Sequence, residues 1–417
     1  MKKFLALLLS LVMALSLFAC GQKNNDSEKA KVKVGFITLH DENSTYDLNF
    51  INGAKEAIAN LGLTDADYVM KNNIPEGQEC LVAAEDLVDQ GCNIIFADSF
   101  GHEPYMIDAA KENPDVQFCH STGTRAHTEG LANYHNAFAS IYEGRYLAGI
   151  AAGMKLNEMI EAGKFTAEEA KMGYVGAFTY AEVVSGYTSF YLGAKSVCPT
   201  VTMEVTFTGS WYDETLEKTG AELLIDRGCK LISQHADSFG APTACQNAGV
   251  PNVSYNGSTK NVGADTYIIS SRIDWAPYYE YAIKAVMDGT AIDADWTGTL
   301  ATGSVVLEEL NTDVAAAGTA EAIEAAKAKL ESGELHVFDV STFTTKADDT
   351  MNTFKVDFLK VDENGHITSY LADVDTDEAY TGDTEVVHDG YFAESEKRSA
   401  PYFDLQIDGI ELLNTAM

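Results

Sequence analysis

The sequence predicts an α/β protein made of two similarly folded units, each a parallel sheet with helices on both faces. Segments of strand type and helix type alternate along most of the chain, which is the pattern of parallel sheets. Residues 84–92 reappear at 221–229 with six of nine positions identical, so one folding unit occurs twice. At 417 residues the chain is also long enough for two or three units. Functional groups are expected where the two units face each other.

The first unit begins after residue 31 and contains three expected helices between expected strands. Short apolar runs predict strands at 32–37, 68–70, 93–97 and 116–119. Apolar residues at helical spacing predict helices at 50–61, 77–90 and 106–112. Gly62 and Gly91 directly follow the first two helices, where a glycine commonly ends a helix.

The second unit repeats this order after a helix expected at 141–156. Strands are expected at 171–178, 201–207 and 230–235, and a helix at 214–227 with Asp213 as its N-cap. Val34-Gly35 is expected to correspond to Val175-Gly176, and Gly53-Ala54-Lys55 to Gly193-Ala194-Lys195.

After the second unit the pattern changes. Strands are expected at 253–255 and 266–270, and a helix at 275–287. Further on, 354–359 and 366–371 flank Asp362-Glu363-Asn364-Gly365, which predicts a β-hairpin. The sequence assigns no role to this β-rich tail.

The N-terminus has the pattern of a lipoprotein signal peptide. Lys2 and Lys3 precede an apolar run at 4–18, and Leu17-Phe18-Ala19-Cys20 resembles the bacterial lipobox, in which Cys20 is lipidated. The alternative is an ordinary signal peptide with an incidental cysteine. No later run reaches the ~18 apolar residues of a spanning helix. We therefore expect a protein anchored by lipid on the extracytoplasmic side of the cell membrane.

Composition excludes several classes of function. The formal net charge is −35, so nucleic acid is not an expected partner. No CxxC or CxxH spacing occurs among the remaining six cysteines, and neither a metal site nor a cofactor is expected. Cys92 and Cys229 are expected to be buried free thiols, although disulfides stay open. Phosphate-binding, dinucleotide-binding, nucleophile-elbow and zinc-protease motifs are missing, which argues against an enzyme.

The repeat locates a candidate cleft, because ligands of open α/β sheets bind outside the carboxyl ends of the strands. The loops there are 39–47 and 98–103 in the first unit, and 179–187 and 234–240 in the second. Candidate ligand contacts in these loops and at one further strand end are Tyr46, Asp47, Ser99, Phe100, Trp211, Gln234 and Asp237. Aromatic faces with carboxylates and amides suit a flat, neutral, hydrogen-bonding ligand. Tyr180, Tyr187 and His235 are expected to be structural.

Four motifs together resemble the basic membrane protein (BMP) family of lipoproteins, which is related to purine nucleoside receptors of ABC importers. They are the lipobox, Val-Gly-Phe-Ile at 34–37 with Ser-Thr-Tyr-Asp-Leu-Asn-Phe at 44–50, Glu-Gly-Arg-Tyr-Leu-Ala-Gly at 143–149, and Gln-His-Ala-Asp-Ser at 234–238. The resemblance covers residues 32–289. It implies a type I periplasmic-binding-protein fold, in which crossing strands join two Rossmann-like lobes around a purine.

The resemblance also implies roles for individual residues. Tyr46 and Trp211 match the family's stacking aromatics, and Asp47 stands where the family usually has an amide. Asn256 stands where many members have a ribose-binding aspartate, so a free purine base or another heterocycle stays open beside a nucleoside. Arg272 and Trp275 are weaker candidates, in a segment expected to return to the first lobe.

The expected organisation has four parts. Residues 1–20 are the signal peptide and 21–31 a tether; 32–131 with 258–292 form lobe 1, and 132–257 with 293–417 form lobe 2 and the tail. The predicted function is that of a solute receptor that binds a purine nucleoside or base and delivers it to an ABC permease and its ATPase. Three alternatives stay open: a sensor for a sugar, amino acid or other small signal, an extracellular hydrolase, and an adhesin that uses the tail hairpin.

Overall fold

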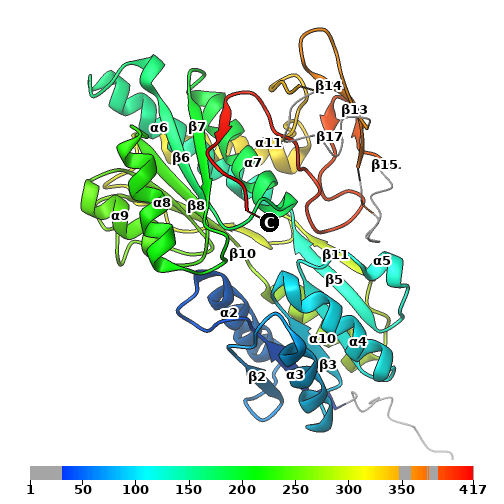
Figure 1. Ribbon diagram of the computed structural model, residues 1–417. Helices are drawn as coiled ribbons and strands as arrows, with labels where there is room; N and C mark the ends of the chain where they lie inside the picture. The colour runs from blue at the N-terminus through cyan, green and yellow to red at the C-terminus, as the bar shows by residue number, and fades with distance from the viewer. Residues whose placement is uncertain (1–30, 347–357, 373, 375–383, 417) are drawn as a thin grey trace, which may run out of the picture.

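The computed structural model describes residues 31–346, 358–372, 374 and 384–416 (Figure 1). The predicted signal peptide, Cys20, the tether up to residue 30 and residues 354–357 of the first predicted strand of the tail hairpin lie outside these residues. Within them the chain forms two α/β lobes and a β-rich C-terminal part that lies against the second lobe (Figure 1).

Lobe 1 is built on a six-stranded sheet in which every pairing is parallel. The strand order is β11-β5-β4-β3-β1-β2. The strands are β1 (Val34–Ile37), β2 (Tyr68–Lys71), β3 (Ile94–Ala97), β4 (Gln117–Ser121), β5 (Tyr134–Ala139) and β11 (Asp295–Gly298). The helices are α2 (Thr45–Asn60), α3 (Gln78–Asp89), α4 (Glu103–Glu112), the short α5 (Ala126–Glu129) and α10 (Ala276–Asp288), with a 3-10 turn at Phe100–His102.

The two faces of this sheet bury different side chains, because successive residues of a strand point to opposite faces. Ile94 and Phe96 of β3 pack with Phe50 of α2 in one apolar cluster. Ile95 lies in a second cluster with Leu87 of α3. Helices therefore cover both faces, and only the ends of the strands are left open for a site.

Lobe 2 is built on a seven-stranded sheet in the order β12-β10-β9-β8-β6-β7-β18, in which β12 alone is antiparallel to its neighbour. The strands are β6 (Lys171–Gly176), β7 (Thr202–Phe207), β8 (Leu231–His235), β9 (Asn252–Tyr255), β10 (Tyr267–Ile273), β12 (Val305–Leu307) and β18 (Ile410–Leu412). The helices are α6 (Ile141–Glu161), α7 (Ala181–Val197), α8 (Glu214–Asp226), α9 (Gly240–Ala248) and α11 (Thr319–Ser332), with a 3-10 turn at Ala167–Glu169.

The chain crosses between the lobes three times: between β5 and α6, between β10 and α10, and between β11 and β12. Two hydrogen bonds tie the crossings together, from Ser140 N to Gly298 O at 2.8 Å and from Asp274 N to Ser304 O at 2.8 Å. The expected segment boundaries differ from this pairing. Residues 132–257 were expected in lobe 2, but β5 joins the sheet of lobe 1. Residues 258–292 were expected in lobe 1, but β10 joins the sheet of lobe 2. Residues 293–417 were expected in lobe 2, but β11 joins the sheet of lobe 1. β5, β10 and β11 each pair within one lobe, and the chain enters the other lobe only after the strand ends. A boundary placed at the loop before such a strand therefore assigns the strand to the wrong lobe.

The internal repeat corresponds to equivalent helix–strand units, α3 with β3 and α8 with β8. Leu87 and Leu224 are both fully buried, and each accepts a backbone hydrogen bond of 3.0 Å, from Cys92 and Cys229 respectively. Gly91 and Gly228 between them have φ of +85° and +91°, a conformation that glycine adopts without a steric penalty. All six cysteines of the described residues are buried free thiols, as expected for Cys92 and Cys229.

One expected equivalence is wrong by three residues. A side-chain carbon at Gly35 would lie 2.9 Å from Leu87, and one at Gly173 would lie 2.9 Å from Leu224. Gly35 therefore corresponds to Gly173, not to Gly176. The strand contains two similar dipeptides, Met-Gly and Val-Gly, and the more similar one is not the equivalent one. The absence of a side chain at each glycine leaves space for the buried leucine of the same repeat unit.

The C-terminal part adds small sheets to lobe 2. β13 (Leu359–Val361) pairs antiparallel with β14 (Ile367–Ala372), so the described portion of the predicted hairpin is present, with Gly365 at φ +87° in its turn. β15 (Thr384–Glu385) extends this sheet, and β16 (Val387–His388) pairs with β17 (Tyr391–Phe392). Among the helices of the described ranges, none is long and apolar enough to cross a membrane.

Candidate functional site

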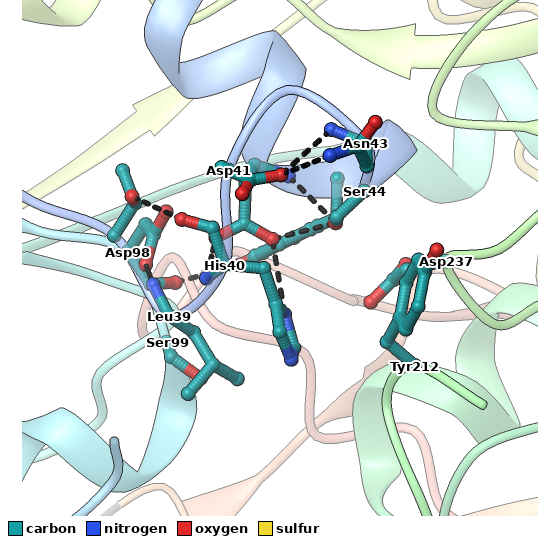
Figure 2. A network of polar contacts seen from close by, with 12 residues as sticks. Leu39, His40, Asp41, Asn43, Ser44, Asp98, Ser99, Tyr212 and Asp237 are labelled. Carbon is teal, nitrogen blue, oxygen red and sulfur yellow. Dashed lines mark hydrogen bonds and ion pairs between the residues drawn. The ribbon is translucent and has the colours of Figure 1, made fainter. Parts of the chain in front are cut away.

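A pocket lies between the two lobes, at the carboxyl ends of their strands. Its lining residues come from both lobes: Leu39, His40, Tyr46, Asp47, Ser99, Phe100 and Thr122 from lobe 1, and Glu182, Trp211, His235 and Asp237 from lobe 2. Figure 2 shows Asp237 and Tyr212 of lobe 2 facing the loop of His40. The site is therefore complete only when both lobes contribute to it.

The loop between β1 and α2 forms part of the lobe 1 wall and is organised by Asp47. The carboxylate of Asp47 accepts hydrogen bonds from His40 N at 2.7 Å and from Ser44 Oγ at 2.6 Å. Burial pushes the pKa of Asp47 upward, but the bonds from His40 and Ser44 outweigh it, so the pKa lies below its ordinary value. Both carboxylate oxygens are thus occupied within the loop, and Asp47 holds His40 in place.

Aromatic rings supply the flat surfaces of the site. Tyr46 lines the pocket with its hydroxyl donating to Asp98 O at 2.8 Å, which fixes the ring. On the opposite lobe Trp211 packs edge-on against Phe178, with ring centres 5.0 Å apart. Phe100 of lobe 1 stacks on Tyr180 of lobe 2 at 5.2 Å, so an aromatic contact bridges the lobes at the rim.

The lobes are in direct contact beside the pocket. Thr45, the first residue of α2, donates from its backbone N to Asp237 O at 3.0 Å and from its hydroxyl to the same oxygen at 3.1 Å. Counted as space open to the centre of a water molecule, the cavity measures about 20 Å³. A single water needs roughly 10–15 Å³ by that measure. This is a closed conformation, and anything larger than a few atoms requires the lobes to separate.

Buried acids give the site its electrostatic character. Burial raises the pKa of Asp237 well above its ordinary value, and the nearby carboxylate of Asp47 raises it further. The pKa of Asp98 is raised in the same way, by burial and then by Asp47. Glu182 lies at the first turn of α7, with Oε1 3.4 Å from Nε2 of His235. Burial lowers the pKa of His235, which favours a neutral ring. Such a pocket disfavours anions and offers hydrogen-bond partners to a neutral ligand, since a carboxyl group that keeps its proton can both donate and accept.

Thr122 presents an unsatisfied hydroxyl to the pocket. The residue is 3% exposed, and its Oγ1 has no hydrogen-bond partner in the described structure. Its φ is +73°, a rare value for a β-branched residue, and such strain concentrates at functional sites. A ligand in the cleft is the natural partner for this hydroxyl, since a buried polar group without one is costly.

The structure brings six of the ten predicted contacts into the pocket lining: Tyr46, Asp47, Ser99, Phe100, Trp211 and Asp237. Asn256 lies just behind them, with Nδ2 donating to Asp237 Oδ1 at 3.3 Å. Ser99 donates its hydroxyl to Glu76 at 2.5 Å, so this donor is already engaged within lobe 1.

Besides Asn256, three further predicted contacts lie outside the pocket lining. Gln234 points to the other face of β8 and accepts from Asn252 at 3.0 Å, because neighbouring residues of a strand alternate and His235 takes the pocket side. Arg272 is paired with Glu308 at 2.6 Å and with Asp274 at 3.3 Å. Trp275 is 1% exposed and stacks on Phe50 with ring centres 4.4 Å apart, so it belongs to the core.

Five lining residues were not among the predicted contacts: Leu39, His40, Thr122, Glu182 and His235. Four of them lie within loops that the repeat had already placed at the cleft, and His235 was assigned a structural role instead. Thr122 directly follows the fourth strand of lobe 1, and the strand-end rule applied to β4 would have found it.

The site is equipped for reversible binding of a small molecule. It combines three aromatic rings, three carboxylates and two imidazoles around a closable space. Throughout the described portion of the chain, no three His, Cys, Asp or Glu side chains are grouped so that they could hold a metal ion.

Several known proteins resemble this chain in sequence. The family described as PnrA-like ABC transporter substrate-binding proteins (Bmp) matches residues 35–339. A purine-binding protein of Brucella abortus is 32% identical over 263 residues, covering 62% of this chain and 70% of the relative. A Haloferax volcanii protein provisionally named an ABC transporter glucose-binding protein is 33% identical over 258 residues. That match spans 62% of each chain.

Solved structures show the same fold. An ABC transporter solute-binding protein from Aeropyrum pernix superposes with a TM-score of 0.60 at 19% identity, covering 74% of this chain and 93% of that one. The two lobes with parallel sheets are thus a type I periplasmic-binding-protein fold, and the additional C-terminal strands lie outside the family match.

Proposed function

The chain belongs to the Bmp family of PnrA-like ABC transporter substrate-binding proteins, and we propose that it binds a purine nucleoside or a purine base in the cleft between its lobes. One observation carries the proposal: aromatic rings of both lobes, Tyr46 and Phe100 on one side and Trp211 on the other, flank a pocket rich in hydrogen-bond acceptors. A purine is flat and carries ring and exocyclic N–H donors. The purine-binding relative from Brucella abortus supports the same ligand class.

Each group has a task in this binding mode. Tyr46 and Trp211 stack on the two faces of the ring, a contact worth about 1–3 kcal/mol per base for aromatic side chains. Glu182 and Asp237 accept N–H donors at the edges. Thr122 supplies its hydroxyl, and Asn256 orients Asp237 from behind. Asn256 lacks the carboxylate with which many family members bind a ribose, and this difference favours a free base over a nucleoside.

Binding is coupled to hinge closure, in which the three crossings open and close the cleft around the ligand. The ligand is delivered to an ABC permease and its ATPase. The receptor acts on the extracytoplasmic side of the cell membrane, anchored there through lipidated Cys20. Replacing Cys20 with serine is expected to release the protein into the medium, and membrane retention of that variant would refute the anchor.

A sugar is the second candidate, because the Haloferax volcanii relative carries the name of a glucose-binding protein. Isothermal titration with adenine, hypoxanthine, guanosine, adenosine and glucose separates the two. We expect saturable binding of at least one purine and none of glucose. Glucose binding with no response to any purine would overturn the purine assignment, and a base that binds tighter than its nucleoside would support the reading of Asn256.

Mass spectrometry gives an independent test. The purified protein is denatured and the small molecules that it releases are identified. A purine in the released fraction supports the proposal, whereas a released hexose supports the sugar alternative.

A further inference from the structure

The last described segment of the chain returns to the rim of the ligand pocket. β18 pairs in parallel with β7 at the edge of the lobe 2 sheet, and Figure 1 shows this red segment running back toward the middle of the molecule. The family match ends at residue 339, so this strand lies outside it.

After β18 ends, the segment continues to form hydrogen bonds, first with the last residue of β7 and then with the loop that follows β6. The amide of Asn414 pairs with Phe207 in both directions, accepting from its N at 2.7 Å and donating to its O at 2.8 Å. Ala416 then pairs with Thr179: Thr179 N donates to Ala416 O at 2.7 Å, and Ala416 N donates to Thr179 Oγ1 at 3.0 Å. The segment thus reaches past β7 to the loop that follows β6.

Gly209 turns the chain at the end of β7. Its φ is +74°, a left-handed conformation that glycine adopts without a steric penalty. A side-chain carbon on it would lie 3.8 Å from Ala416 Cβ, an ordinary contact distance, so Ala416 packs beside this turn.

The loop that follows β6, which Ala416 contacts through Thr179, is part of the proposed ligand site. Thr179 lies between Phe178, which packs on Trp211 at 5.0 Å, and Tyr180, which stacks on Phe100 of lobe 1 at 5.2 Å. Glu182 of the pocket lining follows within three residues. Phe178, Tyr180 and Glu182 therefore lie within three residues of Thr179 along the chain.

We propose that residues 410–416 are a positioning strand for the ligand site and that Thr179 is the positioning residue through which they act. The inference rests on the proposed function for its effect on affinity. If the bonds to Ala416 are lost, the loop spends part of its time in conformations that misplace Glu182 and Trp211. Apparent affinity falls in proportion to the competent fraction.

The first test is a matched set of variants assayed for purine binding by titration calorimetry. Thr179→Val removes the acceptor of the Ala416 bond and is expected to raise Kd about fivefold, the equivalent of one ordinary hydrogen bond. Thr179→Ser restores the hydroxyl and should stay within about twofold of the parent. Thr415→Val makes the same chemical change at an exposed residue of the same segment and is expected to leave Kd unchanged. Equal Kd values for Thr179→Val and the parent would overturn the proposal.

Hydrogen–deuterium exchange tests the positioning without any ligand. We expect faster exchange for the peptide containing residues 177–184 in Thr179→Val, and faster still in a chain truncated after Leu413, with α11 unaffected. Unchanged exchange in both variants would overturn the positioning role. If the parent protein binds no purine, the proposed function fails while the exchange result still decides this inference.

Discussion

Thr122 and Asn256 occupy equivalent positions in the two lobes, and both have a left-handed backbone. Thr122 follows β4 with φ +73°, and Asn256 follows β9 with φ +67°. Thr122 N donates to Ala137 O of β5 at 3.0 Å, and Asn256 N donates to Ser271 O of β10 at 2.9 Å. The internal repeat therefore extends to the backbone of the cleft, where each lobe presents one buried polar residue in a strained conformation.

Thr122→Gly is expected to separate stability from binding. Glycine adopts positive φ without a steric penalty, so the free energy of unfolding should be unchanged or rise by up to about 1 kcal/mol. The loss of the hydroxyl should weaken purine binding about fivefold. Urea unfolding and calorimetric titration measure the two effects. Asp389→Gly is the control, because Asp389 also has positive φ, at +52°, but lies in the C-terminal part; its binding should match the parent.

The repeat made the location of the cleft predictable from sequence, because a glycine-ended helix followed by a buried strand fixes where each strand ends. The direction in which individual side chains point was harder to predict from the sequence. Gln234 and His235 are adjacent in one polar strand tip, and only the register of β8 decides which of them faces the pocket. An aromatic residue such as Trp275 has the same local pattern whether its ring fills the core or the cleft.

Long-range pairing explains the remaining differences. Nothing local in the sequence around Ile410 indicates that β18 joins β7, since the partners are about 200 residues apart. The contact of Thr45 with Asp237 likewise depends on the closure of two lobes. The fold class followed from short-range periodicity, whereas the completed site depends on contacts between distant segments.

Trp211 should report ligand binding by its fluorescence. It is the tryptophan of the pocket lining, whereas Trp275 is buried in the core and Trp296 packs on Tyr281. We expect a saturable change in tryptophan emission on addition of the purine, and its loss in Trp211→Phe. Trp211→Ala should also weaken binding by about 1–3 kcal/mol through lost stacking. A full signal in Trp211→Phe would show that the ligand lies elsewhere.

Trp275 provides the opposite case. Its ring stacks on Phe50, and its Cβ lies 3.0 Å from the place where a side-chain carbon on Gly53 would stand. Trp275→Ala should therefore cost about 3–5 kcal/mol of unfolding free energy. The milder Trp275→Phe should keep the stack and the parent Kd while lowering the thermal midpoint. A large change in Kd with an unchanged midpoint would place Trp275 in the binding site instead.

Glu143 should lower the stability of the protein as the pH rises from about 4.5 to about 7, against the opposite contribution of buried histidines such as His235, whose pKa burial lowers. Burial raises the pKa of Glu143 to about 7, from an ordinary value of 4.5. Between these two values the folded chain holds a proton that the unfolded chain has released, so folding loses free energy with increasing pH, by at most about 1.4 kcal/mol per pH unit for one proton. Glu394, whose pKa burial raises to about 8, acts in the same direction.

Glu143→Gln isolates this contribution. Glutamine still offers an acceptor to Leu300 N, which donates to Glu143 Oε2 at 3.3 Å, but it does not titrate. Urea unfolding at several pH values should show that the unfolding free energy of the variant depends less negatively on pH than that of the parent. Glu161→Gln, at the exposed end of the same helix, serves as the control and should follow the parent curve. Identical slopes for Glu143→Gln and the parent would contradict the prediction.

Closure of the cleft should depend on the backbone N–H of Thr45, and proline at this position removes it selectively. Thr45 is the first residue of α2, where proline is well tolerated because that N–H has no partner within the helix. Ser44 before it has φ −82° and ψ 128°, a conformation that a following proline accepts. Thr45→Pro therefore deletes both hydrogen bonds to Asp237 O while the helix keeps its start.

The expected result is a shift toward the open form. Small-angle X-ray scattering of the ligand-free protein should give a larger radius of gyration for Thr45→Pro than for the parent, and purine affinity should fall about tenfold through two lost hydrogen bonds. Thr45→Val, which keeps the N–H, should lose about half of that free energy. A parent-like radius and affinity in Thr45→Pro would mean that closure rests instead on the aromatic contacts between the lobes, Phe100 with Tyr180 and His40 with Tyr212.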